Sequence, residues 1–324
     1  MQKSKICMTQ LLEVSDLKIS YQQGPAIVED LSFSLAGGEI LALVGESGCG
    51  KSLSGLAILR LLPRGIMIEK GNILFREKEL TSLPEEGIRR IRGRELAIVF
   101  QDPMASLNPV FTVGDQVAEV LEWHFGYPKE KALQRAAELF KEVGIPAPRE
   151  RLRAYPHELS GGMRQRVMIA MALAGEPALL IADEPTTALD VTIQAQILEL
   201  LAGLRKSRGL SILLITHDLG VVAELADRVA VMYAGRLVEV APCETLYEEP
   251  AHPYTRALLA ALPRPGQRKL YSLPGSVPPP GKRPAGCKFV DRCPQARPLC
   301  RKEEPPLELW APDHWVRCFY AGDT

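Results

Sequence analysis

The stretch Glu39–Ser52 reads Glu-Ile-Leu-Ala-Leu-Val-Gly-Glu-Ser-Gly-Cys-Gly-Lys-Ser, a short apolar run followed by a glycine-rich turn. The run predicts a buried strand, and residues 51–62 predict a helix. In this context the glycines let backbone N–H groups surround phosphate oxygens, Lys51 reaches the β- and γ-phosphates, and Ser52 binds Mg²⁺. The stretch therefore predicts a P-loop; an incidental Lys-Ser after a glycine-rich turn is the alternative. The predicted nucleotide-binding residues are Gly45, Glu46, Ser47, Gly48, Cys49, Gly50, Lys51, Ser52 and Leu53.

A second apolar run ends in two carboxylates. Residues 179–185 read Leu-Leu-Ile-Ala-Asp-Glu-Pro, which places Asp183 and Glu184 at the end of a predicted buried strand. Ligands of open α/β sheets bind at the carboxyl ends of the strands, so we expect both acids to face the P-loop. We predict that Asp183 holds Mg²⁺ and that Glu184 deprotonates the attacking water. Helix capping by an acidic turn is the alternative.

Strands and helices alternate along the second half of the chain. This alternation predicts an α/β fold with a mainly parallel sheet and helices on both faces. A helical subdomain near residues 102–166 interrupts it, and seven prolines and four glycines predict a linker over residues 263–286. The predicted strands are 11–19, 31–35, 39–44, 96–100, 179–182, 212–215, 229–232 and 236–240. The predicted helices are 51–62, 115–125, 129–143, 160–174, 193–207 and 219–225.

Charge and hydropathy narrow the class of protein. Lys+Arg and Asp+Glu are equal at 39 each, which argues against a nucleic-acid partner. Residues 1–12 lack the features of a secretion signal, and no apolar run approaches the ~20 residues that cross a bilayer. If the protein acts at a membrane, we expect it to do so as a peripheral subunit.

Residues 159–166 read Leu-Ser-Gly-Gly-Met-Arg-Gln-Arg and open a predicted helix. Ser160 suits a helix N-cap, and Gly161 and Gly162 let a ligand approach the exposed N–H groups. The stretch predicts a second anion site, with an ordinary capped helix as the alternative.

With these motifs, residues 8–262 resemble the ATP-binding-cassette (ABC) ATPases, which implies a P-loop NTPase cassette with an antiparallel β-region at its N-terminus. Residues 160–165 are similar to the signature motif of that family. Four other family marks have matches: Gln101 for the Q-loop, residues 188–190 for the D-loop, His217 for the switch histidine, and Tyr21 for the aromatic ring stacked on adenine.

The resemblance implies that two ATPase subunits pair head to tail, with each ATP between the P-loop of one and the signature helix of the other. Ser160, Gly161, Gly162 and Asp190 would then serve the nucleotide of the partner. Gln101 would contact Mg²⁺ and the attacking water, and His217 the γ-phosphate.

Three further stretches, residues 100–109, 155–166 and 252–259, resemble the di- and oligopeptide permease ATPases. Nickel and glutathione importers share much of this pattern. The resemblance implies a second, distinct ATPase, two membrane subunits, an extracytoplasmic binding protein, and a peripheral location on the cytoplasmic face of the membrane. Met104, Leu107 and Phe111 are candidate contacts for a membrane subunit; packing within the helical subdomain is the alternative.

The C-terminal extension, residues 263–324, contains four cysteines: Cys287, Cys293, Cys300 and Cys318. Four thiolates suit tetrahedral Zn²⁺ or an iron–sulfur cluster, and the spacing is typical of neither. The extension resembles that of the peptide permease ATPases, which implies a [4Fe–4S] cluster. Zn²⁺ and free thiols are the alternatives. His314 is expected at the surface, with a role as a stand-in metal ligand as the alternative.

Two rival functions belong to other classes. A soluble ABC ATPase acting on DNA or ribosomes usually carries two cassettes or a long coiled-coil insertion, whereas only 58 residues separate Gln101 from Ser160 here. An iron–sulfur regulatory protein would need a nucleic-acid-binding face, which the neutral charge does not indicate. The sequence therefore favours a transport ATPase.

Overall fold

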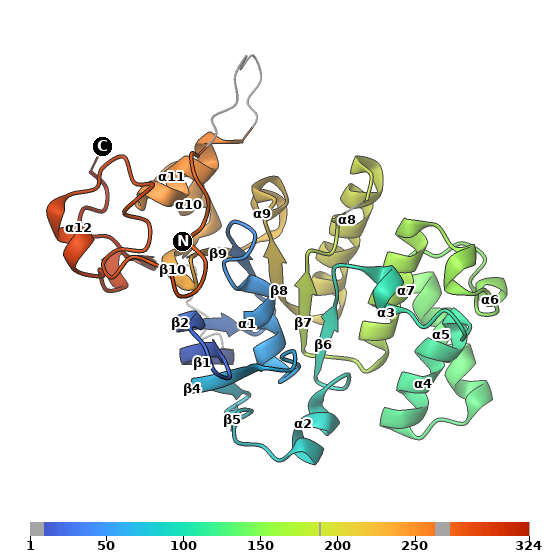
Figure 1. Ribbon diagram of the computed structural model, residues 1–324. Helices are drawn as coiled ribbons and strands as arrows, with labels where there is room; N and C mark the ends of the chain where they lie inside the picture. The colour runs from blue at the N-terminus through green and yellow to red at the C-terminus, as the bar shows by residue number, and fades with distance from the viewer. Residues whose placement is uncertain (1–9, 188, 263–272, 324) are drawn as a thin grey trace, which may run out of the picture. The chain divides into compact units, whose positions relative to one another are not determined.

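The computed structural model describes residues 10–187, 189–262 and 273–323 (Figure 1). The chain forms two compact units: unit 1 combines residues 1–81 with 214–324, and unit 2 is Ser82–Leu213. The predicted domain start at residue 8, Ala188 of the D-loop, and residues 263–272 of the predicted linker lie outside the described ranges. Within those ranges, no helix combines the length and apolarity that a membrane crossing requires.

An antiparallel sheet lies at the beginning of unit 1, with the strand order β2-β1-β4-β5. Its strands alternate buried and exposed side chains, so that Leu31, Phe33 and Leu35 are buried while the serines between them are partly exposed. The antiparallel N-terminal region implied by the ABC resemblance is therefore present. The strands are β1 Gln10–Tyr21, β2 Ala26–Ala36, β4 Ile66–Phe75 and β5 Lys78–Glu79.

The other sheet strands of unit 1 include a parallel pair, β3 (Ile40–Val44) with β9 (Arg228–Tyr233). All five residues of β3 are buried, as a strand covered on both faces requires. The hairpin from β9 into β10 turns through Ala234 and Gly235, both with positive φ (45° and 82°). The remaining strands are β10 Arg236–Pro242, β11 Glu308–Ala311 and β12 His314–Val316, and the helices are α1 Lys51–Ile58, α9 Leu219–Leu225, α10 Cys243–Glu248, α11 Pro253–Ala260 and α12 Pro298–Lys302.

Unit 2 contains the parallel pair β6 (Leu96–Val99) and β7 (Leu179–Asp183), with a helical segment between them in the sequence. β8 (Ser211–Thr216) leads the chain back into unit 1. The parallel strand pairs, with helices after β3, β6 and β7, confirm the predicted α/β fold. The helices are α2 Glu85–Ile91, α3 Pro103–Ser106, α4 Val113–Phe125, α5 Lys129–Glu142, α6 Pro148–Arg151, η1 Pro156–Glu158, α7 Gly161–Ala174 and α8 Val191–Arg208.

A buried polar network joins the C-terminal extension to the rest of unit 1. Glu239 on β10 is fully buried; its carboxylate accepts N–H bonds from Ala251 (2.7 Å) and His252 (2.9 Å) and lies 2.7 Å from Nε2 of His314. The prediction of a surface position for His314 is therefore wrong. The sequence shows a histidine near an exposed turn, but the pairing of β12 with β10 carries its side chain inward onto Glu239.

Acid is expected to weaken this network. Burial disfavours the charged form of His252 and lowers its pKa to about 4, so the unfolded chain, with a histidine pKa near 6.5, binds the proton more readily. The stabilisation is complete above about pH 6.5 and is lost as pH falls toward 4. We expect urea unfolding to show a loss of about 2 kcal/mol from this residue between pH 7 and pH 5.

The matched variant is His252→Asn, because Nδ1 of His252 accepts from the N–H of Tyr254 (3.0 Å) and an Asn side chain can cap the helix without titrating. It should remove this part of the pH dependence, whereas His157→Asn at an exposed position should not. An unchanged pH profile in the His252→Asn protein would contradict the assignment.

Candidate functional site

The predicted P-loop connects β3 to α1 in unit 1, and its backbone requires glycine at two points. Gly45 has φ 154°, and a Cβ there would lie 2.1 Å from the carbonyl oxygen of Met232. Gly50, the residue before α1, has φ 106°, and its Cβ would lie 2.7 Å from Val28. No side chain fits at either point without strain, because the loop passes close to the Met232 backbone at Gly45 and to the Val28 side chain at Gly50.

Lys51 lies inside this loop with 5 % of its surface exposed. Its Nζ donates to the carbonyl oxygens of Gly45 (2.7 Å) and Glu46 (3.1 Å), which satisfies an ammonium that burial would otherwise penalise. The neighbouring Cys49 is also buried, and burial raises the pKa of its thiol, which keeps it neutral. The Lys51 ammonium therefore lies inside the loop, bonded to two backbone carbonyl oxygens. An anionic ligand can take the place of these carbonyls as the partner of the ammonium.

Three more predicted residues of unit 1 have exposed side chains. Tyr21 ends β1 with 46 % of its surface exposed, Ser52 follows Lys51 on α1, and His217 follows β8. An exposed tyrosine ring at a strand end is free of core packing on one side, as stacking on a flat ligand requires. The adenine role of Tyr21 stays a prediction.

Unit 2 brings Gln101 and Glu184 together. Gln101 follows β6 and Glu184 follows the adjacent parallel strand β7, and Nε2 of Gln101 donates to Oε2 of Glu184 (2.9 Å). The hydroxyl of Thr187 donates to the same oxygen (2.9 Å). Glu184 has φ 47°, a conformation costly for a non-glycine residue and one found at functional sites. Asp183, the last residue of β7, is buried.

The predicted signature motif begins helix α7. Ser160 is the N-cap, and its Oγ accepts from the N–H of Met163 (3.4 Å). Ser160 and Gly161 are exposed, whereas a Cβ on Gly162 would lie 2.7 Å from the Ile193 side chain. The tip of α7 is thus an open helix N-terminus, with the start of α8 beside it.

Asp190 lies at the start of α8, close to the Ile193 side chain that faces Gly162. It is the exposed N-cap of α8, and its side chain accepts from the N–H of Ile193 (3.0 Å). The predicted signature and D-loop residues therefore lie near one another in unit 2.

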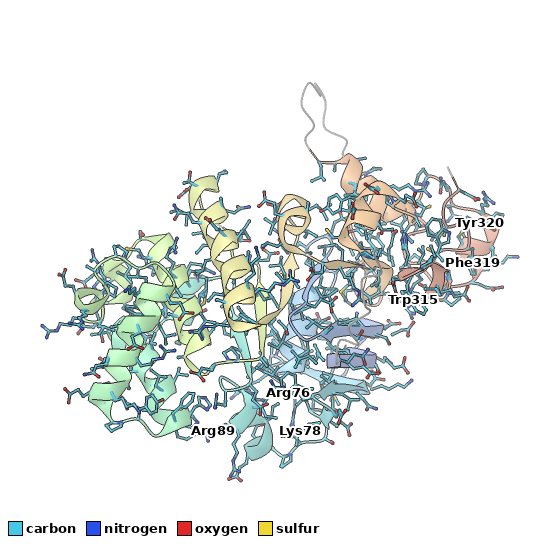
Figure 2. All side chains as sticks on the ribbon, turned by 180° about the vertical axis from the view of Figure 1, so that it is seen from behind. Arg76, Lys78, Arg89, Trp315, Phe319 and Tyr320 are labelled. Atoms are coloured by element: carbon cyan, nitrogen blue, oxygen red, sulfur yellow. The ribbon has the colours of Figure 1, made fainter. Side chains whose placement is uncertain are left out.

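The four cysteines of the extension line one cavity of about 20 Å³, together with Phe289, Val290 and Tyr320. Figure 2 labels Tyr320, whose ring carries the guanidinium of Arg297 at 3.9 Å. Burial raises the pKa of Cys287 to about 12 and also raises those of Cys293 and Cys318. Among the described residues, no three His, Cys, Asp or Glu side chains are arranged to hold a single metal ion.

Sequence reasoning missed the side chains that hold the P-loop from outside. The hydroxyl of Tyr254 accepts from the N–H of Glu46 (3.0 Å), and the guanidinium of Arg292 binds the Glu46 carboxylate. These partners lie 208 and 246 residues from Glu46 in the sequence. No spacing pattern in a single sequence signals contacts at such separations.

Two family models match this chain: "ABC transporter" over residues 28–187 and "Oligopeptide/dipeptide transporter, C-terminal region" over residues 238–300. A probable peptide ABC transporter ATP-binding protein of Sinorhizobium fredii, y4tR, is 48% identical over 97% of this chain and 96% of its own. The oligopeptide transport ATP-binding protein AppD of Bacillus subtilis is 50% identical over 96% of this chain and 97% of its own.

Solved structures agree with these matches. A dimeric ATP-binding cassette in a post-hydrolysis state, bound to ADP and Pi, is 26% identical with a TM-score of 0.65, over 72% of this chain and 98% of that one. The cbiO1 protein of Clostridium perfringens, part of the ABC transporter complex cbiONQ, is 30% identical with a TM-score of 0.65, over 74% of this chain and 91% of its own. The chain therefore belongs to the ABC transporter ATP-binding proteins, among the members that carry the oligopeptide/dipeptide transporter C-terminal region.

Proposed function

We propose that this ATPase drives the uptake of di- or oligopeptides through separate membrane subunits. The contact between Gln101 and Glu184 carries the proposal for hydrolysis, because Gln101 and Thr187 both donate to the Glu184 carboxylate and so orient a group that can act as a general base. The peptide cargo is supported by the relatives, which are named as peptide or oligopeptide transport proteins.

In this proposal each predicted residue has a chemical role. The P-loop amides and Lys51 bind the β- and γ-phosphates, and Tyr21 stacks on the adenine ring. Glu184 takes the proton of the attacking water, Gln101 orients that water, and His217 stabilises the γ-phosphate. Ser160, Gly161, Gly162 and Asp190 act on the nucleotide bound by the paired subunit.

Mg²⁺ fits the chemistry of the predicted ligands. Ser52 offers a hydroxyl, Asp183 a carboxylate and Gln101 an amide oxygen, the oxygen donors that this ion prefers. Bound there, Mg²⁺ would neutralise charge on the phosphates.

The partners follow from the same proposal. Two membrane subunits form the pathway, a second ATPase, a distinct paralogue, completes the nucleotide sites, and an extracytoplasmic binding protein delivers the peptide. The chain then lies on the cytoplasmic face of the membrane as a peripheral subunit.

Reconstitution tests the cargo. The chain would be co-purified with the membrane subunits and second ATPase encoded beside it, placed in proteoliposomes, and assayed for ATP hydrolysis with the loaded binding protein. Stimulation by peptides is the expected result. Stimulation of ATP hydrolysis by nickel or glutathione, but not by peptides, would show that the cargo is not a peptide. Failure to assemble with the membrane subunits would favour a non-transport ATPase.

The loop after Gln101 is the proposed contact with a membrane subunit. Met104 (50 %), Val110 (71 %) and Phe111 (54 %) expose apolar surface there, whereas Leu107 is only 2 % exposed. The prediction that Leu107 offers a docking side chain is wrong, because that side chain is buried. Exposed apolar side chains close in sequence are typical of a protein interface.

Phe111→Asp is therefore expected to uncouple the transporter. Peptide uptake should fall about tenfold or more, since a charge replaces a buried apolar contact in the assembled complex. Basal ATP hydrolysis of the isolated ATPase should stay unchanged. Trp123→Asp, at an exposed apolar position (64 %) on α4, is the control. Normal uptake in the Phe111→Asp transporter would remove the loop from the interface.

We propose that the cysteine cavity holds a [4Fe–4S] cluster, a group that four cysteine thiolates bind in proteins. Four thiols share one apolar cavity, and the resemblance to the peptide permease extension supports the assignment. Cys287, Cys293, Cys300 and Cys318 would hold the cluster as thiolates, and the cluster would tie together a segment too small for its own core.

Anaerobic purification should yield brown protein with about four iron and four sulfide per chain, as a [4Fe–4S] cluster contains. Cys300→Ser should lose most of this iron, because Cys300 lines the cavity, while Cys243→Ser in α10 should retain it. Colourless protein that contains zinc would establish the alternative metal. Colourless, metal-free protein with intact thiols would show that the four cysteines are free thiols packed within the extension.

A further inference from the structure

A bidentate ion pair connects the C-terminal extension to the P-loop. Nη1 of Arg292 donates to Oε2 of Glu46 (2.6 Å) and Nη2 donates to Oε1 (2.9 Å). The Arg292 side chain is 6 % exposed and that of Glu46 is 30 % exposed. A planar guanidinium that faces both oxygens of a carboxylate fixes its orientation as well as its charge.

Arg292 is itself held from three sides. Its Nε donates to the carbonyl oxygen of Pro274 (2.8 Å), Nη1 also reaches the hydroxyl of Tyr233 (3.4 Å), and its guanidinium lies 5.7 Å from the centre of that ring. Burial lowers the pKa of Arg292, but the bonds to Glu46 and Tyr233 outweigh it and raise the pKa above the usual value, so the group stays charged. The arginine is therefore preorganised before any nucleotide arrives.

Glu46 is equally constrained at its backbone. Its N–H donates to the hydroxyl of Tyr254 (3.0 Å) and its carbonyl oxygen accepts from Nζ of Lys51 (3.1 Å). Tyr254 packs on Tyr233 and on Phe289 of the extension, with ring centres 4.7 and 5.3 Å apart. Side chain and backbone of this P-loop residue thus both rest on groups tied to the extension.

A carboxylate in a loop that binds a polyphosphate is an electrostatic problem. Like charges repel, and the repulsion grows where water is excluded. The fork of Arg292 neutralises Glu46 and turns its carboxylate toward the extension. Without that arginine, the negative charge of Glu46 would oppose the phosphates.

We propose that Arg292 is a positioning residue for nucleotide binding, through which the cysteine-bearing extension sets the affinity of the P-loop for ATP. Arg292 directly precedes Cys293, and its N–H donates to the carbonyl oxygen of Phe289 (3.0 Å); Phe289 and Cys293 both line the cysteine cavity. A rearrangement of the cysteines therefore moves the arginine, whatever group the cavity holds. ATP hydrolysis by the cassette does not by itself require a contact between the P-loop and the C-terminal extension, so this role of Arg292 goes beyond the ATPase activity.

A charge-neutralisation cycle tests the proposal by the Kd for MgATP, measured on the full-length chain with a non-hydrolysable analogue. Arg292→Gln should raise the Kd about tenfold, the size expected when one partner of a desolvated charge pair is lost. Arg292→Lys keeps the positive charge but loses the two-pronged contact with Glu46. Its Kd should therefore lie between those of the wild-type protein and Arg292→Gln. Arg301→Gln is the matched control, because Arg301 makes an exposed pair with Asp291 in the same extension (3.3 Å, 65 % and 69 % exposed).

The double variant Arg292→Gln/Glu46→Gln separates charge from structural damage. It removes the unpaired carboxylate, so its Kd should return to within about threefold of the wild-type value. If Arg292→Gln does not fold, Arg292→Lys carries the test, with a Kd above the wild-type value and raised by less than about tenfold. Wild-type affinity in Arg292→Gln would overturn the proposal, and so would a double variant that binds MgATP as weakly as Arg292→Gln.

Discussion

Replacing Glu184 by Gln is expected to slow ATP hydrolysis by ~10²–10⁴-fold, the usual contribution of a general base, while MgATP still binds. The amide keeps the size of the carboxylate and can still accept from Gln101 and Thr187, the two donors that now reach Oε2 at 2.9 Å each. It cannot take a proton from water. The loss should therefore appear in kcat and leave the Kd for nucleotide unchanged.

The control for this variant is Glu176→Gln, which removes a carboxylate whose side chain is 57 % exposed in the same unit. It should hydrolyse ATP at the normal rate. A Glu184→Gln protein with normal turnover would mean that another group accepts the proton, and the assignment of the base would be wrong.

Replacing Lys51 by Met is expected to weaken MgATP binding by roughly 10²-fold, because a buried cation that pairs with the phosphates is lost. The methionine side chain fills a similar volume, so the P-loop glycines keep their conformation. The carbonyls of Gly45 and Glu46, which now accept from Nζ, lose that donor.

Lys70→Met at an exposed position of β4 is the control, and it should bind nucleotide normally. Affinity of the Lys51→Met protein for MgATP, measured by fluorescence of a labelled nucleotide, decides the question. A Kd within threefold of the wild-type value would contradict the proposed contact with the phosphates.

The local parts of the fold could be predicted from the sequence because their causes are local. The apolar run of β3, the glycines at 45 and 50 and the Ser160 N-cap act within a few residues, and the structure has a strand, a loop and a helix start there. Helix α1 ends at Ile58 rather than near residue 62, because the chain turns through Arg60 with φ 52°.

Strand β4 is absent from the sequence-based prediction for a physical reason. Its centre, Glu69-Lys70-Gly71, interrupts the apolar–polar alternation, and Gly71 has φ 102° beside a shift in the pairing with β1. Such an irregular edge region has no periodic signal, and its pairing with β1 is what makes it a strand.

Contacts between residues far apart in the sequence could not be predicted, for a related reason. Periodicity reports which face of an element is buried, but not which distant residue faces it. The pairs Arg292–Glu46 and His314–Glu239 join positions 246 and 75 residues apart, and Leu107 is buried by packing that its loop-like sequence does not show. The positions of the candidate motifs on strands and helices could therefore be predicted, whereas the support around them required the structure.

The most direct test of the account is the structure of the assembled ATPase pair that carries Glu184→Gln and is saturated with MgATP. The account predicts that the amides and hydroxyl of Ser160–Gly162 in this chain contact the γ-phosphate of the ATP held by the P-loop of the paired subunit. A nucleotide-bound pair in which residues 160–162 face solvent, away from any γ-phosphate, would contradict it.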